Sequence, residues 1–250
     1  MRLLLLAAMR ALTNSKQVPT LEEEVALLSQ GYSFIAGVDE AGRGSLAGPV
    51  VAAAVILPLG IPFRFDPDEC MACFEGVRDS KQLTARERDR LFEVIMQHAV
   101  AVGVGIGSVE MIDERNILQA TKYAMREALA QLTIPPQALL LDAIHLPGIE
   151  LLQRSIIKGD ALCLSIAASS IIAKVTRDRM MIQLHEHFPA YGFAQHKGYG
   201  TEYHLVALRE HGATPHHRRS FAPVRELFGL FQVEDLNSSG LVVRSKERLE

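Results

Sequence analysis

Acidic residues stand at the ends of apolar, strand-like runs in separate parts of this sequence. Asp39 and Glu40 follow the run FIAGV, Asp142 follows ALLL, and Asp160 follows SIIKG. In a sheet covered by helices, functional sites form where strands end. Gathered carboxylates repel one another and raise each other's pKa values, unless a hard cation such as Mg²⁺ or Mn²⁺ binds them. The pattern therefore favours a divalent-metal site, although each acid taken alone would be interpreted as the cap of a turn or helix.

A glycine-rich turn, Gly42-Arg43-Gly44, directly follows the first acidic pair. Glycine lets a backbone approach a sugar–phosphate chain closely, and arginine binds phosphate. No Gly-Lys-Ser/Thr ends this run, which excludes a Walker loop, and the spacing does not fit a dinucleotide-binding fingerprint. A plain hairpin turn would explain the glycines but not the acids before them. With two metal ions about 4 Å apart, such a site could hydrolyse a phosphodiester.

The bulk composition is that of an ordinary globular protein, with 48% hydrophobic and 22% charged residues. The formal net charge is -3, so no overall positive field indicates a nucleic-acid partner. Three cysteines, Cys70, Cys73 and Cys163, are too few for a disulfide framework. Cys70 and Cys73 form a C-x-x-C pair that lacks further ligands at zinc-finger spacing. These cysteines predict a reducing, cytoplasmic compartment.

The two ends of the chain differ from its middle. Residues 1–10 resemble a signal peptide only superficially, because the apolar run is short and no small-residue cleavage site follows. That run is also too short to span a bilayer, and we expect no membrane association. We predict an N-terminal extension with a short helix over 1–33, a catalytic domain over 34–188, a C-terminal helical portion packed on it over 189–232, and a flexible tail over 233–250.

Hydrophobic periodicity places strands and helices along the chain. We expect strands at 34–38, 49–57, 99–108, 138–141 and 155–157. We expect helices at 20–30, 86–98, 117–132 and 164–182. Thr20 and Glu23 form a capping-box pattern, Asp113 is a candidate cap, and the segment 58–77 is expected to be a loop. Strands in a meander, followed by strands alternating with helices, predict an α/β fold with a mixed sheet covered by helices.

A series of motifs along the chain is similar to those of ribonuclease HII, in the order of that family. They are GVDEAGRGSLAGPVVAAAVIL (37–57), DSKQLT (79–84), LLLDA (139–143), KGD (158–160), SIIAKVTRDR (170–179), HKGYGT (196–201) and HRRSF (217–221). Any one of them could arise by chance, but the ordered series is specific. The resemblance implies a ribonuclease H-like mixed β-sheet flanked by helices, with a small helical C-terminal portion.

The same resemblance implies a metal-dependent endoribonuclease that cuts the RNA strand of RNA–DNA hybrids. Cleavage 5′ of single ribonucleotides embedded in duplex DNA is included, and the products carry 3′-hydroxyl and 5′-phosphate ends. The implied cofactor is Mn²⁺ or Mg²⁺, acting by two-metal-ion catalysis. The implied partners are RNA–DNA hybrids and ribonucleotide-containing duplex DNA, and we expect a monomer.

Matching the motifs residue by residue assigns the catalytic and metal-binding carboxylates to Asp39, Glu40, Asp142 and Asp160. Neighbouring residues of a strand face opposite ways. Glu40 is therefore expected to contribute differently from Asp39, with its main chain as one option.

A second set of residues is implied to bind substrate. Gly42, Arg43 and Gly44 match the turn that reads the 2′-hydroxyl of the ribonucleotide, the group that distinguishes RNA from DNA. Tyr199 matches the aromatic residue that packs on the next sugar, a deoxyribose. A bare ring detects a missing hydroxyl, because a ribose oxygen there would be desolvated without a partner.

Phosphate contacts are implied for Ser80, Lys81, Lys174 and Arg177, and such contacts position a nucleic acid rather than read its sequence. For Lys174 and Arg177 a solvated helix face is an equal alternative.

Some features stand outside the implied site. His196, His216 and His217 are interpreted as structural or solvent-exposed, because hard-metal chemistry does not require imidazole. Ser45 stands where the family usually has proline, and Ala143 replaces the common glycine after Asp142. Neither change removes a catalytic group.

Two other functions remain open from the sequence. A non-catalytic hybrid-binding module on the same scaffold would be expected to lose at least one carboxylate, and all four are present. A different two-metal phosphodiesterase of this superfamily, such as a resolvase or integrase relative, would not need the Gly-Arg-Gly turn together with Tyr199.

Overall fold

The computed structural model describes residues 18–60 and 65–227. The predictions for residues 1–10 and for the tail at 233–250 lie outside the described residues. The chain divides into two compact units, each assembled from separate segments. Among the described residues, the first unit comprises 18–41, 50–60, 65–106 and 121–177, and the second comprises 42–49, 107–120 and 178–227. The continuous domain boundaries expected from the sequence stay a prediction.

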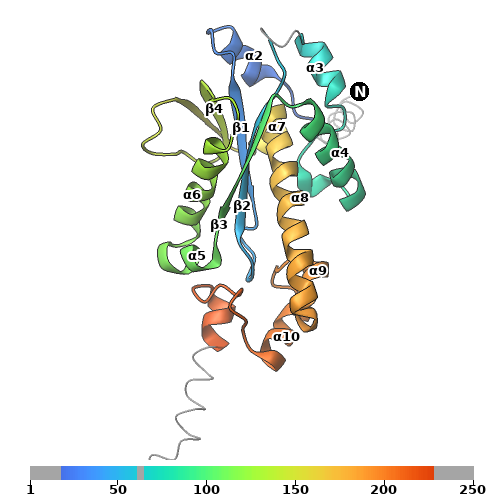
Figure 1. Ribbon diagram of the computed structural model, residues 1–250, viewed down its shortest axis with the longest axis vertical. Coiled ribbons are helices and arrows are strands. Elements are labelled where there is room, and N and C mark those ends of the chain that lie inside the picture. Colours follow the sequence, from blue (N-terminus) through green and yellow to red (C-terminus); the bar gives the residue numbers. More distant parts are fainter. Residues whose placement is uncertain (1–17, 61–64, 228–250) are drawn as a thin grey trace, which may run out of the picture. The chain divides into compact units, whose positions relative to one another are not determined.

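The first unit is built on a mixed five-stranded sheet in the order β3-β2-β1-β4-β5 (Figure 1). Its strands are β1 (Ile35–Ala41), β2 (Val50–Ile56), β3 (Ala101–Gly107), β4 (Ala138–Asp142) and β5 (Leu152–Ile156). β1 pairs antiparallel with β2 and parallel with β4, and β4 pairs parallel with β5. The predicted mixed sheet is therefore confirmed, although the last strand begins earlier than expected.

Helices cover both faces of this sheet (Figure 1). They are α2 (Glu22–Leu28), α3 (Pro67–Cys73), the 3-10 turn η1 (Ser80–Gln82), α4 (Ala85–His98), α6 (Ile117–Ala130), α7 (Gly159–Leu162) and α8 (Leu164–His187). Glycines allow the closest contacts: a Cβ on Gly103 or Gly105 of β3 would lie 2.0 Å from a carbonyl oxygen of α6. β1 approaches the first turn of α8 just as closely, through Gly37.

The main apolar core lies between the sheet, α8 and α4. Val55 of β2, Leu91 and Ile95 of α4, and Ile171 of α8 are all buried in it. Cys70 of α3 packs into the same core, and burial raises the pKa of its thiol to about 12. A thiol with that pKa is protonated at neutral pH and unreactive.

The second unit has a smaller core of its own. It contains α5 (Val109–Arg115), the end of α8 from Asp178, η2 (Pro189–Tyr191), α9 (Phe193–His196) and α10 (Glu202–His211). Tyr191 stacks on Phe193 with ring centroids 5.4 Å apart. Leu46, Met181 and Leu208 pack in the same cluster. Short helices of this kind take most of their stability from such tertiary contacts.

Three local predictions are wrong. Leu21, not Thr20, is the N-cap of the first helix; the Thr20 hydroxyl accepts from the Glu22 N–H at 3.4 Å, and its backbone pairs with Cys163 in an isolated β-bridge. Asp113 lies inside α5, where its carboxylate accepts hydrogen bonds from the backbone of residues 219 and 220. The expected loop at 58–77 contains α3, which begins with a capping box between Asp66 and Glu69.

The contact between β1 and α8 gives a test of the fold. A Cβ at Gly37 would lie 2.2 Å from the backbone carbon of Ser165. We expect Gly37→Ala to lower the free energy of unfolding by about 3 kcal/mol, because two backbones must move apart. Gly44→Ala is the control, since a Cβ there meets nothing within 4 Å. Urea denaturation measures both, and equal stabilities of the two variants would contradict this packing.

Candidate active site

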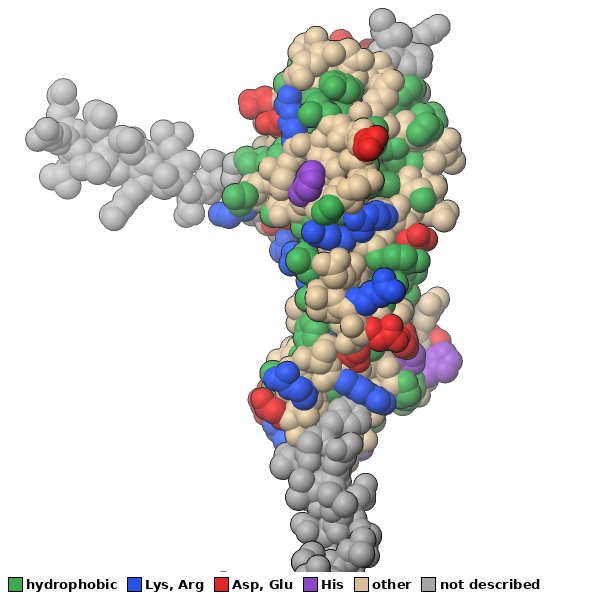
Figure 2. Space-filling model, turned by 90° about the vertical axis from the view of Figure 1, so that its left-hand side faces the viewer, with side chains coloured by type: hydrophobic (Ala, Val, Ile, Leu, Met, Phe, Trp, Pro, Cys, Tyr) green, Lys and Arg blue, Asp and Glu red, His purple; other side chains and the backbone are tan. Residues whose placement is uncertain are grey.

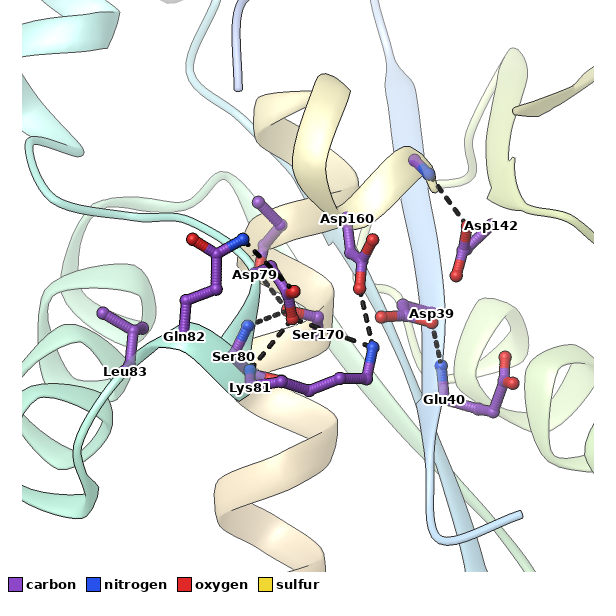
Figure 3. Close-up of polar contacts among 12 residues, drawn as sticks. Asp39, Glu40, Asp79, Ser80, Lys81, Gln82, Leu83, Asp142, Asp160 and Ser170 are labelled. Atoms are coloured by element: carbon purple, nitrogen blue, oxygen red, sulfur yellow. Dashed lines mark hydrogen bonds and ion pairs between the residues drawn. The ribbon is translucent and has the colours of Figure 1, made fainter. Parts of the chain in front are cut away.

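Three carboxylates from separate segments converge at one end of the sheet (Figure 3). Val38 of β1 pairs with Leu141 of the parallel strand β4, so the next residues, Asp39 and Asp142, emerge side by side. Asp160 lies in α7, which follows β5. Oxygen atoms of Asp39, Asp142 and Asp160 all lie within 4.8 Å of one another. The convergence expected from the strand ends is therefore present.

Burial makes this cluster electrostatically strained. Asp39 is only 3% exposed. Burial, followed by the charges of Glu40 and Asp142, raises the pKa of Asp39 well above its usual value. Burial and the charge of Asp160 likewise raise the pKa of Asp142. Backbone amides oppose both shifts, because the Glu40 N–H donates to Asp39 and the Gly159 N–H to Asp142, at 2.7 and 2.8 Å.

One cationic side chain reaches the cluster. Lys81 Nζ donates to Asp160 Oδ2 at 2.7 Å and lies 3.7 Å from Asp79 (Figure 3). Burial alone would lower the pKa of Lys81, but the hydrogen bond and charge of Asp160 outweigh it and raise this pKa. The lysine side chain is 73% exposed, so its ion pair is screened by water and is worth little as a source of stability.

Glu40 lies outside the group of carboxylates. Figure 3 shows its carboxylate directed away from Asp160 and Lys81. This matches the opposite facing of neighbouring strand residues. Its backbone N–H, in contrast, orients Asp39. The metal-binding role assigned to Glu40 stays a prediction, and the main-chain contribution is the form that the geometry accommodates.

The donor set fits a hard divalent cation. It consists of carboxylate oxygens, which suit Mg²⁺ and Mn²⁺. Two of the three side chains, Asp39 and Asp160, are buried, and the charges of Glu40 and Asp142 raise the pKa of Asp39 by more than the charge of Lys81 lowers it. A bound divalent cation would instead favour the ionised form of Asp39. Among the residues that the structure describes, no other group of His, Cys, Asp and Glu has this geometry.

The glycine-rich turn belongs to the second unit and is held by a buried arginine. The side chain of Arg218 is fully buried. It donates to the carbonyl oxygens of Gly42, Arg43 and Gly48, at 2.7 to 3.0 Å. Ser45 closes the turn by donating to Gly42 O at 2.9 Å. Arg43 and Gly44 are exposed and Gly42 is buried, so two of the three residues predicted to read the ribose are accessible.

The loop that carries Tyr199 is tied to this turn within the second unit. Leu46 N–H donates to Gly198 O at 2.8 Å. A Cβ on Gly198 would lie 2.5 Å from Ala47 O, and its φ of +81° also favours glycine. Tyr199 itself is 37% exposed. Both segments predicted to read the sugars are therefore fastened together.

The predicted phosphate contacts differ in accessibility. Lys81 is exposed and Lys174 is half-buried. Ser80 is 5% exposed and Arg177 is fully buried. The alternative of a solvated helix face is thus wrong for Arg177, and a phosphate contact would require its guanidinium to become accessible. These substrate-binding roles stay predictions.

Sequence reasoning missed two supporting residues. Arg218 belongs to the HRRSF motif, and membership of that motif is the signal in the sequence that could point to it. His204 carries no motif signal, yet it is fully buried and contacts the backbone of the Tyr199 loop. His217 is buried and His216 is exposed. These two placements fit the interpretation of the histidines as structural or solvent-exposed.

Comparisons with known proteins agree with this geometry. A family profile described as Ribonuclease HII matches residues 36–224. The Ribonuclease HII of Bacillus cereus (strain Q1) is 53% identical over 206 residues, which cover 82% of this chain and 75% of that protein. This chain belongs to the ribonuclease HII family. It is therefore a metal-dependent endoribonuclease, and it hydrolyses the RNA strand of RNA–DNA hybrids.

Solved structures agree on the fold. The crystal structure of the ribonuclease H2 from Pyrococcus horikoshii OT3 is 28% identical with a TM-score of 0.66, covering 80% of this chain and 99% of that one. Bst-RNase HIII in complex with Mn²⁺ is 20% identical with a TM-score of 0.56, covering 86% and 71%. At that identity the second likeness supports the fold alone.

Family membership decides between the functions left open by the sequence. A non-catalytic hybrid-binding module is not the function of a ribonuclease HII enzyme, and a resolvase or integrase relative would belong to another family. Within residues 18–60 and 65–227, no helix has both the length and the apolar character needed to cross a bilayer.

The electrostatic strain at Asp39 gives a prediction for the metal-free protein. The folded-state pKa of Asp39 lies above its unfolded value, so the folded protein keeps a proton that the unfolded chain has lost. Protonated Asp39 therefore favours the folded state. Its contribution to the free energy of unfolding is complete below about pH 4 and is lost as the pH rises through the raised pKa. We expect Asp39→Asn to melt about 2–4 °C higher than wild type in EDTA at pH 8, and the gap to close as the pH falls.

The matched control is Asp68→Asn, which changes an exposed aspartate of α3. At pH 8 it should melt at or slightly below the wild-type temperature, because a carboxylate in the first turn of α3 interacts favourably with the N-terminal end of the helix dipole. Added Mn²⁺ should raise the melting temperature of wild type and of the control but not that of Asp39→Asn, because ligand binding to the folded state alone stabilises it. A destabilised Asp39→Asn variant at pH 8 in EDTA would contradict the account of the cluster.

Proposed function

We propose that this enzyme cleaves RNA–DNA hybrids, and DNA duplexes carrying a single ribonucleotide, by two-metal-ion catalysis at Asp39, Asp142 and Asp160. The observation that supports this most directly is the gathering of three carboxylate oxygens within 4.8 Å at the strand ends. Two divalent ions held there, Mg²⁺ or Mn²⁺, would activate a water and stabilise the leaving oxygen of the phosphodiester.

The chemistry fixes the products. Water adds to the phosphorus on the 5′ side of the ribonucleotide, and the bond to the 3′ oxygen of the preceding nucleotide breaks. The leaving oxygen takes up a proton and becomes a 3′-hydroxyl, while the ribonucleotide keeps a 5′-phosphate. Lys81, which neutralises Asp160, is suited to the negative charge of the phosphate backbone.

Recognition of the ribonucleotide is proposed for the turn 42–44 and for Tyr199. Exposed Arg43 and Gly44 offer a guanidinium and backbone groups to a 2′-hydroxyl. The Tyr199 ring offers an apolar surface to the next sugar, and a ribose hydroxyl buried there would lack a hydrogen-bond partner. Selection would then favour an RNA-to-DNA junction, as excision of embedded ribonucleotides requires.

The surface charge is consistent with recognition of the nucleic acid through contacts at the site rather than through a long-range positive field. On the face drawn in Figure 2, Lys and Arg side chains are interspersed with acidic and apolar ones. A protein with a net charge of -3 gains little from a long-range field on a polyanion. We further infer a cytoplasmic, monomeric enzyme; its cysteines are free thiols, as a reducing compartment requires.

Cleavage of a DNA duplex with one embedded ribonucleotide tests the proposal. We expect cuts 5′ of the ribonucleotide in Mg²⁺ or Mn²⁺ and none in EDTA. Asp142→Asn should lower kcat/KM by more than the roughly 100-fold that the loss of an outer-shell partner costs, and Asp68→Asn should match wild type. Near-normal cleavage by Asp142→Asn, in a sample shown to be folded, would contradict the assignment.

The role of Tyr199 is tested by comparing two substrates. One strand carries a single ribonucleotide in DNA, and the other is all RNA, each paired with the same DNA strand. We expect Tyr199→Ala to reduce the ratio of kcat/KM values for these substrates by about tenfold, since stacking on a ring contributes about 1–3 kcal/mol. Tyr199→Phe keeps the ring and should keep the ratio. An unchanged ratio in Tyr199→Ala would remove this residue from recognition.

A further inference from the structure

The second unit contains a buried pair of histidines that the proposed chemistry does not use. His204 lies in the first turn of α10, and His217 follows in the segment after that helix. Both are fully buried, with their Nε2 atoms 3.0 Å apart. The ring of Phe193 packs 5.5 Å from one and 5.6 Å from the other. Two imidazoles in such surroundings must satisfy each other's hydrogen bonds.

The pair ends on two backbone groups whose roles are fixed. The Thr214 N–H donates to His217 Nδ1 at 2.9 Å. At the other end, His204 Nδ1 lies 2.9 Å from the carbonyl oxygen of Tyr199. An amide N–H can only donate and a carbonyl can only accept. His217 must therefore carry its proton on Nε2 and donate it to His204 Nε2, while His204 carries its own on Nδ1 and donates to Tyr199 O.

This chain of hydrogen bonds works only with both rings neutral. A proton added to His204 Nε2 would face the N–H of His217, and one added to His217 Nδ1 would face the N–H of Thr214. Burial agrees with this: it lowers the pKa of His204 to about 4 and, together with the nearby His204, that of His217 to about 3. Near neutral pH this series of hydrogen bonds has one protonation state, and each donor points from Thr214 towards the Tyr199 carbonyl.

This chain of hydrogen bonds ends on the backbone carbonyl of Tyr199, whose side chain is exposed. The Tyr199 carbonyl accepts from the Thr201 N–H at 2.8 Å as well as from His204. Tyr199 stands between Gly198 and Gly200, and glycines leave a backbone free to take other conformations. Two hydrogen bonds on one carbonyl remove that freedom on the C-terminal side of the tyrosine.

A third imidazole supports the same loop. His196 stacks on His204 with ring centroids 4.5 Å apart. Its Nδ1 accepts from the Gly198 N–H at 3.2 Å, and its Nε2 donates to Tyr191 O at 2.6 Å. The backbone on both sides of Tyr199 is thus held by a neutral histidine in a defined tautomer.

We propose that His204 and His217 are positioning residues for Tyr199: through Tyr199 O they fix the ring that reads the sugar after the cleaved ribonucleotide. This inference rests on the proposed function, because it assigns the pair to junction selectivity rather than to metal chemistry. Rotating a ring by a small amount costs contact with a sugar but leaves the carboxylates unchanged. Loss of these hydrogen bonds should therefore lower the selectivity for the single-ribonucleotide substrate more than it lowers the rate of cleavage of an all-RNA strand.

Two variants of one residue separate positioning from general stability. His204→Asn keeps a side-chain N–H donor near the place of Nδ1, whereas His204→Leu keeps comparable bulk without a donor. The readout is the ratio of kcat/KM for the single-ribonucleotide and all-RNA strands, which does not depend on the fraction of folded enzyme. We expect His204→Leu to reduce this ratio by about tenfold, the effect of one buried hydrogen bond. His204→Asn should stay within about threefold of wild type.

A wild-type ratio in His204→Leu, or equal losses in both variants, would overturn the positioning role while leaving the proposed function intact. The proposed function fails in a different way, through a wild-type enzyme without junction preference or a Tyr199→Ala variant that keeps it, and the positioning role falls with it. If His204→Leu does not fold, ¹⁵N spectra of the wild-type histidine rings decide. We expect protonated Nδ1 on His204 and protonated Nε2 on His217, and the opposite tautomers would refute the chain.

Discussion

Confining three carboxylates within 4.8 Å is the constraint on which the rest of the structure depends. Each acid comes from a different segment, and parallel pairing of β1 with β4 sets Asp39 beside Asp142. Their mutual repulsion and the burial of Asp39 oppose folding. Backbone amides and Lys81 offset part of this cost. Strain of this kind persists only where the surrounding fold determines it, here through the packing of α8 on the sheet.

In the second unit, exposed backbone and one aromatic ring are held in a fixed conformation. Its glycines permit close approach to a sugar but supply no rigidity. Buried side chains supply it instead: Arg218 binds carbonyls of the glycine-rich turn, and His204 binds the carbonyl of Tyr199. Because Arg218 directly follows His217 in the sequence, one short segment supports both elements that are proposed to read the substrate. On the proposed function, a substitution in this segment is expected to disturb recognition of the ribonucleotide while leaving the carboxylates in place.

Much of the fold and of the carboxylate site could be predicted from the sequence, since strand patterns are local and acids at strand ends converge wherever the strands are neighbours. The wrong predictions concern residues whose conformation is determined by partners that are distant in the sequence. Thr20 pairs with Cys163 rather than capping α2, and Asp113 binds backbone from the C-terminal segment. His204 could not be found, because its role exists only once His217 lies beside it. Ala143, where glycine is usual, adopts a φ of +50°, a conformation that glycine favours.

The central claim is that these carboxylates share divalent ions. Anomalous diffraction from crystals grown with Mn²⁺ tests it most directly. We predict a metal ion about 2.1 Å from an oxygen of Asp39, with Asp142 or Asp160 as a further ligand. Asp39→Asn crystals under the same conditions should lose that peak. A wild-type crystal with no ion coordinated by Asp39, at a Mn²⁺ concentration that supports hybrid cleavage in solution, would contradict the account.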